Sequence, residues 1–383
     1  MKATEEKMAR YEQMFWRDFI NTEKGTPGFC IPVLRREYNA DSTPGSFNVG
    51  DGTINLALLV ALLSVTDNAP VGYVDCLDTI ERLGKKAYEY FNLKFEFMDI
   101  PDYSDRFFVR DDYDYKTQPI AWGSYKMLET LESEDPCHSP FTSQDQVWNL
   151  NPALSYIMEN DQSLRSRAMK IGEGINSYIA DNGYKLFNPY VSYIRHFFNY
   201  LPSMNEKKVA PWERQQDRTD HFKLTDKVKR GANNWYYSGG TSACLQTFRQ
   251  GKKTYKNGFR TLLYKIEIAL LDKIYEPVYR LFTKNDFKHN SYYCYGACSG
   301  IWYGNYKKRF LKQFESHIKK GELFEPNIVP FVISYSDLSD KAKKSLKSYF
   351  VNLPELVESG IVESPLDSLV IWKWTKTNFY DNF

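Results

Sequence analysis

The run TINLALLVALL, from Thr53 to Leu63, is apolar nearly all round. A helix without a polar face is stable only when it is buried on every side, so this run predicts a core helix. A second helix is predicted from Asp75 to Phe91, where Ile80, Leu83 and Ala87 recur at three- and four-residue spacing among charged residues. Together the two stretches form a pair in which a buried inner helix precedes a one-sided outer helix.

The same order of helices returns three more times, over residues 143–180, 238–276 and 291–319. In each pair the first helix is apolar or rich in small residues, and the second is longer and amphipathic. Pro152 predicts a kink or a later start in the second inner helix. The Asp-Asn-Gly sequence at 181–183 should end the outer helix of that pair, because Asn or Gly suits a left-handed cap.

The segments on either side of the helix pairs predict other structures. Residues 5–21 predict an amphipathic helix, and residues 24–52, rich in Gly, Pro and Asn, predict a loop. From about residue 326 the pairing stops. There, residues 328–335 and 366–374 predict strands and residues 337–349 predict a helix.

A repeated inner and outer helix suits a closed helical ring. Three stretches stand out: Gly50-Asp51-Gly52 before one inner helix, the loop sequence FFVRDD at 107–112, and Ser143–Gln146 before another inner helix. With them, residues 50 to about 320 resemble the six-hairpin glycosidase-like (α/α) toroid proteins. The resemblance implies a mainly α fold, an (α/α) toroid of helical hairpins, and only loosely an activity. The alternative is an open helical array or an irregular helical domain.

On this reading the chain divides into a toroid domain over residues 1–325 and a C-terminal extension over residues 326–383 with strand and helix elements. The extension is expected to be a small α/β appendage or a strand that pairs with a partner in protein assembly. Deleting it should then leave a folded helical core.

The overall composition excludes several classes of protein. The chain has 383 residues and a formal net charge of only +2, so no bulk attraction to nucleic acid or anionic membrane is expected. The longest apolar run is too short for membrane insertion, and no secretory signal precedes the first helix, which favours a cytoplasmic or virion-associated protein. The six cysteines are scattered, which is typical of reduced, buried thiols; no metal site and no cofactor are expected.

Two carboxylates occupy equivalent places in the pattern, because Asp51 and Asp145 each precede an inner helix. The inner helices of a toroid run parallel, so both residues would face one central cavity. Glycoside hydrolysis needs such a pair, one acid to protonate the leaving oxygen and one base or nucleophile. The simpler interpretation is that each carboxylate caps its helix, with Ser143 competing at the second one.

A loop rich in Asp and Tyr, residues 102–115, holds Arg110, Asp111 and Asp112. Carboxylates accept hydrogen bonds from sugar hydroxyls and aromatic rings stack on sugar C–H faces, so this loop suits a glycan; it also suits calcium, although the spacing does not match an EF-hand. Asp111 and Asp112 are therefore further catalytic candidates and Arg110 a substrate-binding one. The simpler interpretation is a solvated loop held by an Arg110 salt bridge.

Aromatic and polar residues elsewhere are candidates for substrate binding, against the commoner alternative of core packing. These are Trp122, Trp148, Asn234, Trp235, Tyr236 and His196. A polysaccharide lyase would use a Tyr or His base and an Asn or Arg that neutralises a uronate, which Tyr236, His196 and Asn234 could supply.

The expected function is a carbohydrate-active protein, either glycoside hydrolase-like or polysaccharide lyase-like, that acts on or binds a glycan in a central cavity. The fold resemblance carries this expectation. The alternative is a non-catalytic structural or adhesion protein, such as a phage virion or tail component that binds a host surface glycan. A virion protein needs no export signal, which agrees with the N-terminal sequence.

Overall fold

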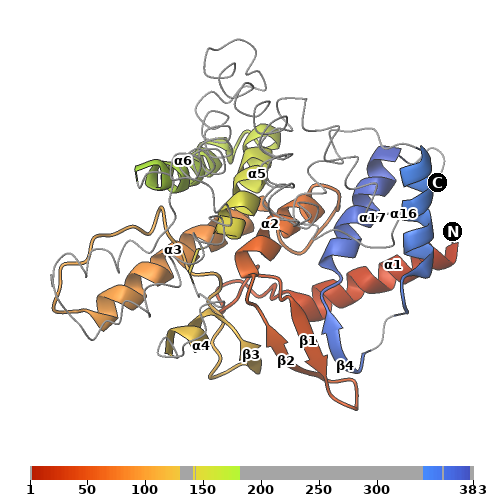
Figure 1. Cartoon of the computed structure of the whole chain (residues 1–383), viewed down its shortest axis with the longest axis horizontal. Helices are drawn as coiled ribbons and strands as arrows, with labels where there is room; N and C mark the ends of the chain where they lie inside the picture. The colour runs from red at the N-terminus through yellow and green to blue at the C-terminus, as the bar shows by residue number, and fades with distance from the viewer. Residues whose placement is uncertain (1, 130–140, 143, 182–339, 356–357, 380–383) are drawn as a thin grey trace, which may run out of the picture.

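The computed structural model of the chain describes residues 2–129, 141–142, 144–181, 340–355 and 358–379 (Figure 1). These residues are predominantly helical and include one small four-stranded sheet. The expected third and fourth helix pairs, the expected strand at 328–335 and the expected domain boundary at 325 lie outside the described residues.

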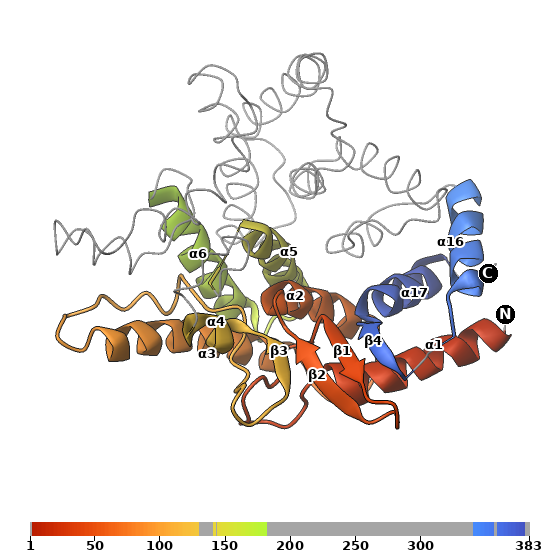
Figure 2. The ribbon, with the colours of Figure 1, turned by 60° about the horizontal axis from the view of Figure 1, so that its bottom comes forward.

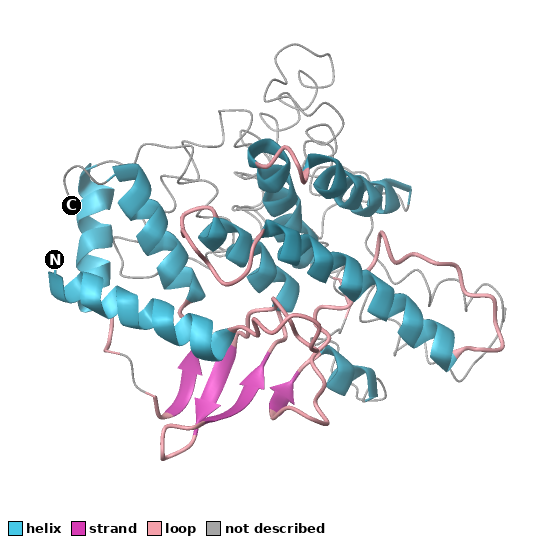
Figure 3. Ribbon diagram, turned by 180° about the vertical axis from the view of Figure 1, so that it is seen from behind, coloured by secondary structure: helices cyan, strands magenta, loops and turns pink. Residues whose placement is uncertain are grey.

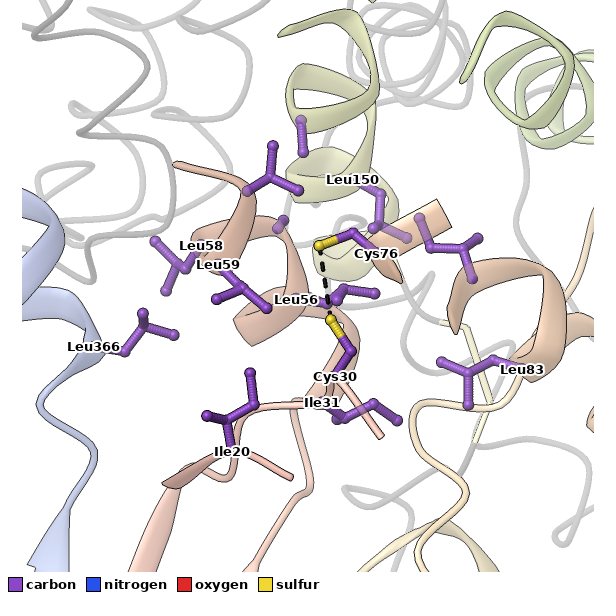
Figure 4. Packing of buried hydrophobic residues seen from close by; sticks show 14 of the residues in the cluster. Ile20, Cys30, Ile31, Leu56, Leu58, Leu59, Cys76, Leu83, Leu150 and Leu366 are labelled. Atoms are coloured by element: carbon purple, nitrogen blue, oxygen red, sulfur yellow. Dashed lines mark hydrogen bonds between the residues drawn. The ribbon is translucent and has the colours of Figure 1, made fainter. Parts of the chain in front are cut away.

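The core helix is α2 (Gly52–Leu63), and every residue from Gly52 to Leu62 is buried, as predicted. The helices α3 (Tyr73–Lys94), α5 (Gln144–Asn160) and α17 (Leu366–Phe379) pack around it. In Figure 4 the leucines of α2 lie among side chains from distant parts of the chain, including Ile20, Leu150 and Leu366. The apolar side chains of α2 are therefore covered by neighbouring elements on each side of the helix.

Both helix pairs predicted in the first half of the chain are confirmed. The first is α2 with α3, and the second is α5 with α6 (Arg165–Asp181). The helix α5 runs through Pro152 without a break, and α6 ends at Asp181, where the Asp-Asn-Gly sequence begins. A short helix, α4 (Ser124–Glu129), follows the Asp- and Tyr-rich loop.

The N-terminal helix is also confirmed. It consists of α1 (Lys2–Met14) and a π-helical turn, η1 (Phe15–Phe19). Its predicted apolar face is buried, with Phe15 and Phe19 fully enclosed.

The sheet was not predicted from sequence. It consists of β1 (Arg35–Tyr38), β2 (Pro44–Asn48), β3 (Ile120–Trp122) and β4 (Gly360–Glu363), in the order β3-β2-β1-β4. The strand β1 pairs antiparallel with β2 and β4, and β2 pairs parallel with β3. The expected loop at 24–52 thus contains two strands, which are short and flanked by turn residues, so their composition resembles that of a loop. Figure 3 shows the sheet at one end of the helical layer.

The C-terminal segment is built into this core. It contains α16 (Asp340–Asn352), close to the predicted helix, then β4 and α17. The prediction of a strand at 366–374 is wrong, because these residues begin α17. Its buried residues point in nearly all directions, so the run carries no helical period and resembles a core strand in sequence.

Three contacts show how the C-terminal segment joins the N-terminal part. The strand β4 pairs with β1 over four residues, and Trp374 Nε1 donates to the carbonyl of Ala61, at 3.1 Å. Lys7 Nζ also donates to the carbonyl of Leu353, at 2.6 Å. Figures 1 and 2 show the two ends of the chain side by side, with α17 between α1 and α2. The described part of the C-terminal extension is therefore part of the core and does not form an appendage.

Within the described ranges, no helix combines the length and the apolar character that crossing a membrane requires.

Candidate functional site

Arg110 joins the two chain segments that lead into α2 and α5. Its Nη1 donates to the carbonyl of Gly50 at 3.1 Å, and its Nε donates to the carbonyl of Phe141 at 3.0 Å. The strand-like pairing of Val109 with Phe141 and the hydrogen bond from Thr142 N to Phe108 O, at 2.9 Å, hold the second segment against the same loop. The start of α2 and the start of α5 are therefore neighbours, bridged by one guanidinium that is only 5% exposed.

Asp51 stands at the first of these helix starts. It occupies the N-cap position of α2, but its side chain makes no capping hydrogen bond. Instead, its Oδ1 lies 3.4 Å from Arg110 Nη1, and the side chain is 40% exposed. Asp51 is thus a solvent-accessible carboxylate beside a buried cation. The capping interpretation does not describe it.

Asp145 is the second residue of α5, so its backbone lies at the second helix start. The structure does not describe the side chain of Asp145 or that of Trp148 on the same helix. Asn234, Trp235, Tyr236 and His196 also fall outside the described residues.

Asp111 is fully buried and bound to the start of α4. Its carboxylate accepts hydrogen bonds from Ser124 N at 2.8 Å and from Tyr113 N at 3.3 Å, while its own N–H donates to Ser124 Oγ at 3.2 Å. Burial raises the pKa of Asp111 to about 7, although these donors act in the opposite direction. This residue was expected to be a catalytic acid or to lie in a solvated loop; in the structure it belongs to the interior.

Asp112 is also buried, and its partner comes from another element. Arg82 on α3 contacts both of its carboxylate oxygens, and Gly28 N donates to Oδ1 at 3.1 Å. Arg82 was not identified from the sequence. It is one of several charged residues on an amphipathic helix, and no local pattern indicates that it pairs with Asp112, 30 positions later. The interpretation of a solvated loop is wrong for Arg110, Asp111 and Asp112, all of which are buried.

Trp122 covers the turn before α2. A Cβ on Gly50 would lie 1.3 Å from Trp122 Cζ3, so only glycine lets the indole lie against this turn. The position is fixed by the hydrogen bond from Val49 N to Trp122 O, at 3.0 Å. Since the Trp122 side chain is half-buried, part of it remains accessible near Asp51.

The cysteines in the described residues behave as expected. Cys30 and Cys76 are free thiols, both buried, with their sulfur atoms 3.9 Å apart (Figure 4). No group of three or more potential metal-ligating side chains gathers anywhere in the described ranges.

The site thus consists of an accessible carboxylate, a buried guanidinium and an indole where two helices begin. It can accept hydrogen bonds from hydroxyl groups and stack against an apolar face. Comparisons of the chain with protein-family models, with curated proteins and with solved structures found no match.

Proposed function

We propose that this chain is a carbohydrate-active protein that binds or cleaves a glycan at the rim formed by the starts of α2 and α5. The finer fold that goes with this proposal is an (α/α) toroid, in which α2 and α5 are neighbouring inner helices. The observation that carries the proposal is the bridge from Arg110 to both segments, Gly50 on one side and Phe141 on the other. In a toroid the starts of the inner helices surround the central cavity.

The chemistry at this rim would rest on Asp51 and Asp145. Asp111 and Asp112 are buried and hydrogen-bonded, so a glycan would not reach them. The catalytic pair would therefore be the two residues at the helix starts. One carboxylate would protonate the leaving oxygen, and the other would act as base or nucleophile. Arg110 would orient Asp51, and Trp122 would supply a stacking surface. A lyase would instead use Tyr236, His196 and Asn234.

One observation favours a second candidate, a non-catalytic protein that binds a glycan in a structural or adhesive role, such as a virion component. Of the expected catalytic acids whose side chains the structure describes, Asp111 and Asp112 are enclosed, and Asp51 alone is accessible. A single carboxylate is sufficient to bind sugar hydroxyls, whereas hydrolysis requires a pair.

The test compares Asp51→Asn with Asp161→Asn. Asp161 holds the turn before α6, since its Oδ1 accepts from Ser163 N at 2.9 Å and Leu164 N at 3.3 Å. Asparagine can replace Asp161 as an acceptor of backbone hydrogen bonds, and the exposed side chain of Asp51 makes no capping hydrogen bond, so both variants should keep wild-type stability. Only Asp51→Asn should lose glycan cleavage, by about 100-fold or more.

The outcomes separate the candidates. Full cleavage by Asp51→Asn would place the chemistry elsewhere. A wild-type protein that binds a glycan from a broad panel without cleaving any would establish the non-catalytic candidate. A protein that neither binds nor cleaves any glycan would contradict the proposal.

A further inference from the structure

A cavity of about 380 Å³ opens between α3, α6 and the loop that follows α3. This volume lies within the range of small-molecule sites. Its floor is apolar, formed by Ile80 from α3, Phe108 from the loop, and Ile171 and Ile175 from α6. The two helices contact each other. The lining includes none of the rim residues Asp51, Arg110 and Trp122, so the cavity is separate from the rim.

Two glycines shape this cavity. A Cβ on Gly84 of α3 would lie 1.9 Å from the carbonyl oxygen of Ser104, and a Cβ on Gly174 of α6 would lie 2.5 Å from that of Asp105. The loop backbone is therefore clamped between the two helices, which holds the side chains of Ser104 and Asp105 in the lining. Arg167 also ties α6 to α3, because its Nε donates to Glu81 Oε1 at 2.9 Å.

The polar part of the lining offers hydrogen-bond donors and acceptors together. The acceptors are the carboxylates of Glu81, Glu89, Asp102 and Asp105, and the donors are the ammonium groups of Lys85 and Lys170 and the hydroxyl of Ser104. Several of these acids already have cationic neighbours outside the lining: Arg167 beside Glu81, Lys86 beside Glu89 and Arg106 beside Asp105. The charges around the cavity are therefore mixed and favour no ligand of high net charge.

We infer that this cavity binds a sugar ring of the glycan. Each sugar hydroxyl both donates and accepts hydrogen bonds, so a ring needs both kinds of partner, and its C–H face needs an apolar surface. The lining contains the aromatic rings of Tyr88 and Phe108 for that contact, together with the charged groups. The Asp- and Tyr-rich loop at 102–115 thus contributes Asp102 and Asp105 to an open cavity, while it buries Asp111 and Asp112. The inference rests on the proposed function and adds a second place of contact.

The experiment measures binding of a panel of disaccharides (cellobiose, maltose, lactose and N,N′-diacetylchitobiose) by saturation-transfer NMR and calorimetry. Ser104→Trp fills the cavity, and Lys170→Ala removes an exposed donor from its lining. Arg165→Ala is the matched control, because it removes a cation from α6 outside the lining. Asp51→Asn serves as the rim variant. A charged hydrogen-bonding partner accounts for about a tenfold change in affinity or more.

We expect Ser104→Trp and Lys170→Ala to weaken disaccharide binding at least about tenfold, and Arg165→Ala to leave it unchanged. Because Lys170 is exposed, its variant should fold even if Ser104→Trp does not. Binding that is lost in Asp51→Asn but kept in Lys170→Ala would overturn the cavity site and leave the proposed function standing. The absence of binding to every disaccharide and every longer glycan would overturn both.

Discussion

Arg82 holds Asp112 through two contacts: Nε lies 2.7 Å from Oδ2, and Nη2 lies 3.1 Å from Oδ1. Arg82 Nη2 also donates to the carbonyl of Phe29, at 2.9 Å, and Gly28 N donates to the same carboxylate. One ion pair therefore joins α3, the loop after it and the segment before β1. Its role is to hold three parts of the chain together.

Asp112→Ala should lower the free energy of unfolding by about 3 kcal/mol, because it leaves a partly buried guanidinium and a backbone N–H without their acceptor. Urea titration followed by circular dichroism measures this. Glu355→Gln is the control, since its pair with Arg10 is exposed and should contribute less than about 1 kcal/mol. A loss below about 1 kcal/mol for Asp112→Ala would show that the pair does not anchor the loop.

Asp111 should make stability depend on pH between about 4 and 7. Burial raises the pKa of this carboxyl from its ordinary value of 3.8 to about 7, so the folded protein holds a proton that the unfolded chain releases above about pH 4. The contribution of Asp111 is therefore greatest below pH 4 and is lost as the pH rises through 7. Asp111→Asn removes the ionisation, so its stability relative to wild type should rise between pH 5 and pH 8, by on the order of 2 kcal/mol.

The control for this pH dependence is Asp41→Asn. Hydrogen bonds from Thr43 lower the pKa of Asp41, so its titration lies below the range from pH 5 to pH 8. Its stability relative to wild type should stay constant over that range. The same constancy for Asp111→Asn would mean that Asp111 is charged in the folded protein at pH 5.

Cys30 and Cys76 should resist alkylation in the folded protein. Their mutual hydrogen bond and their burial raise the pKa of the Cys76 thiol, and the thiolate is the reactive form. N-ethylmaleimide at pH 7 should modify both residues only after unfolding in urea, as read by mass spectrometry of peptides. Modification of the folded protein as fast as in urea, or a disulfide between them, would contradict the buried, reduced pair.

Deletion of residues 340–383 should abolish cooperative folding of the remaining chain. It removes β4 from β1 and uncovers the side of α2 against which α17 packs. This outcome is the opposite of the one expected from the sequence. A truncated protein that still unfolds in one sharp transition would restore that earlier expectation.

A milder variant tests the same contact without removing the segment. Trp374→Phe keeps most of the buried ring but loses the hydrogen bond to Ala61, so unfolding should become easier by about 1 kcal/mol. The loss is measured by urea titration beside the wild-type protein. An unchanged midpoint would indicate that the indole N–H contributes nothing to the docking of α17.

Sequence alone was sufficient for α2, whose nearly all-apolar run at 53–63 is longer than a typical strand, and for α3, where apolar residues of 75–91 repeat at helical spacing. Both patterns are local. It was insufficient for α17, which is buried on nearly all sides, because a helix and a core strand then look alike. It was also insufficient for β1 and β2, whose pairing with β4 and β3 depends on residues far along the chain.

For the candidate site, the sequence determined which residue types stand at the starts of α2 and α5, and it singled out Asp51, Asp145 and the loop with Arg110. Only the tertiary structure decided their roles. Burial and partners depend on contacts between distant segments, such as Arg110 with Phe141 and Asp112 with Arg82. The sequence shows that a residue is an aspartate, but it does not show whether the side chain lies in solvent or in the core. The charge, the pKa and the partners of the carboxylate depend on the residues that pack around it.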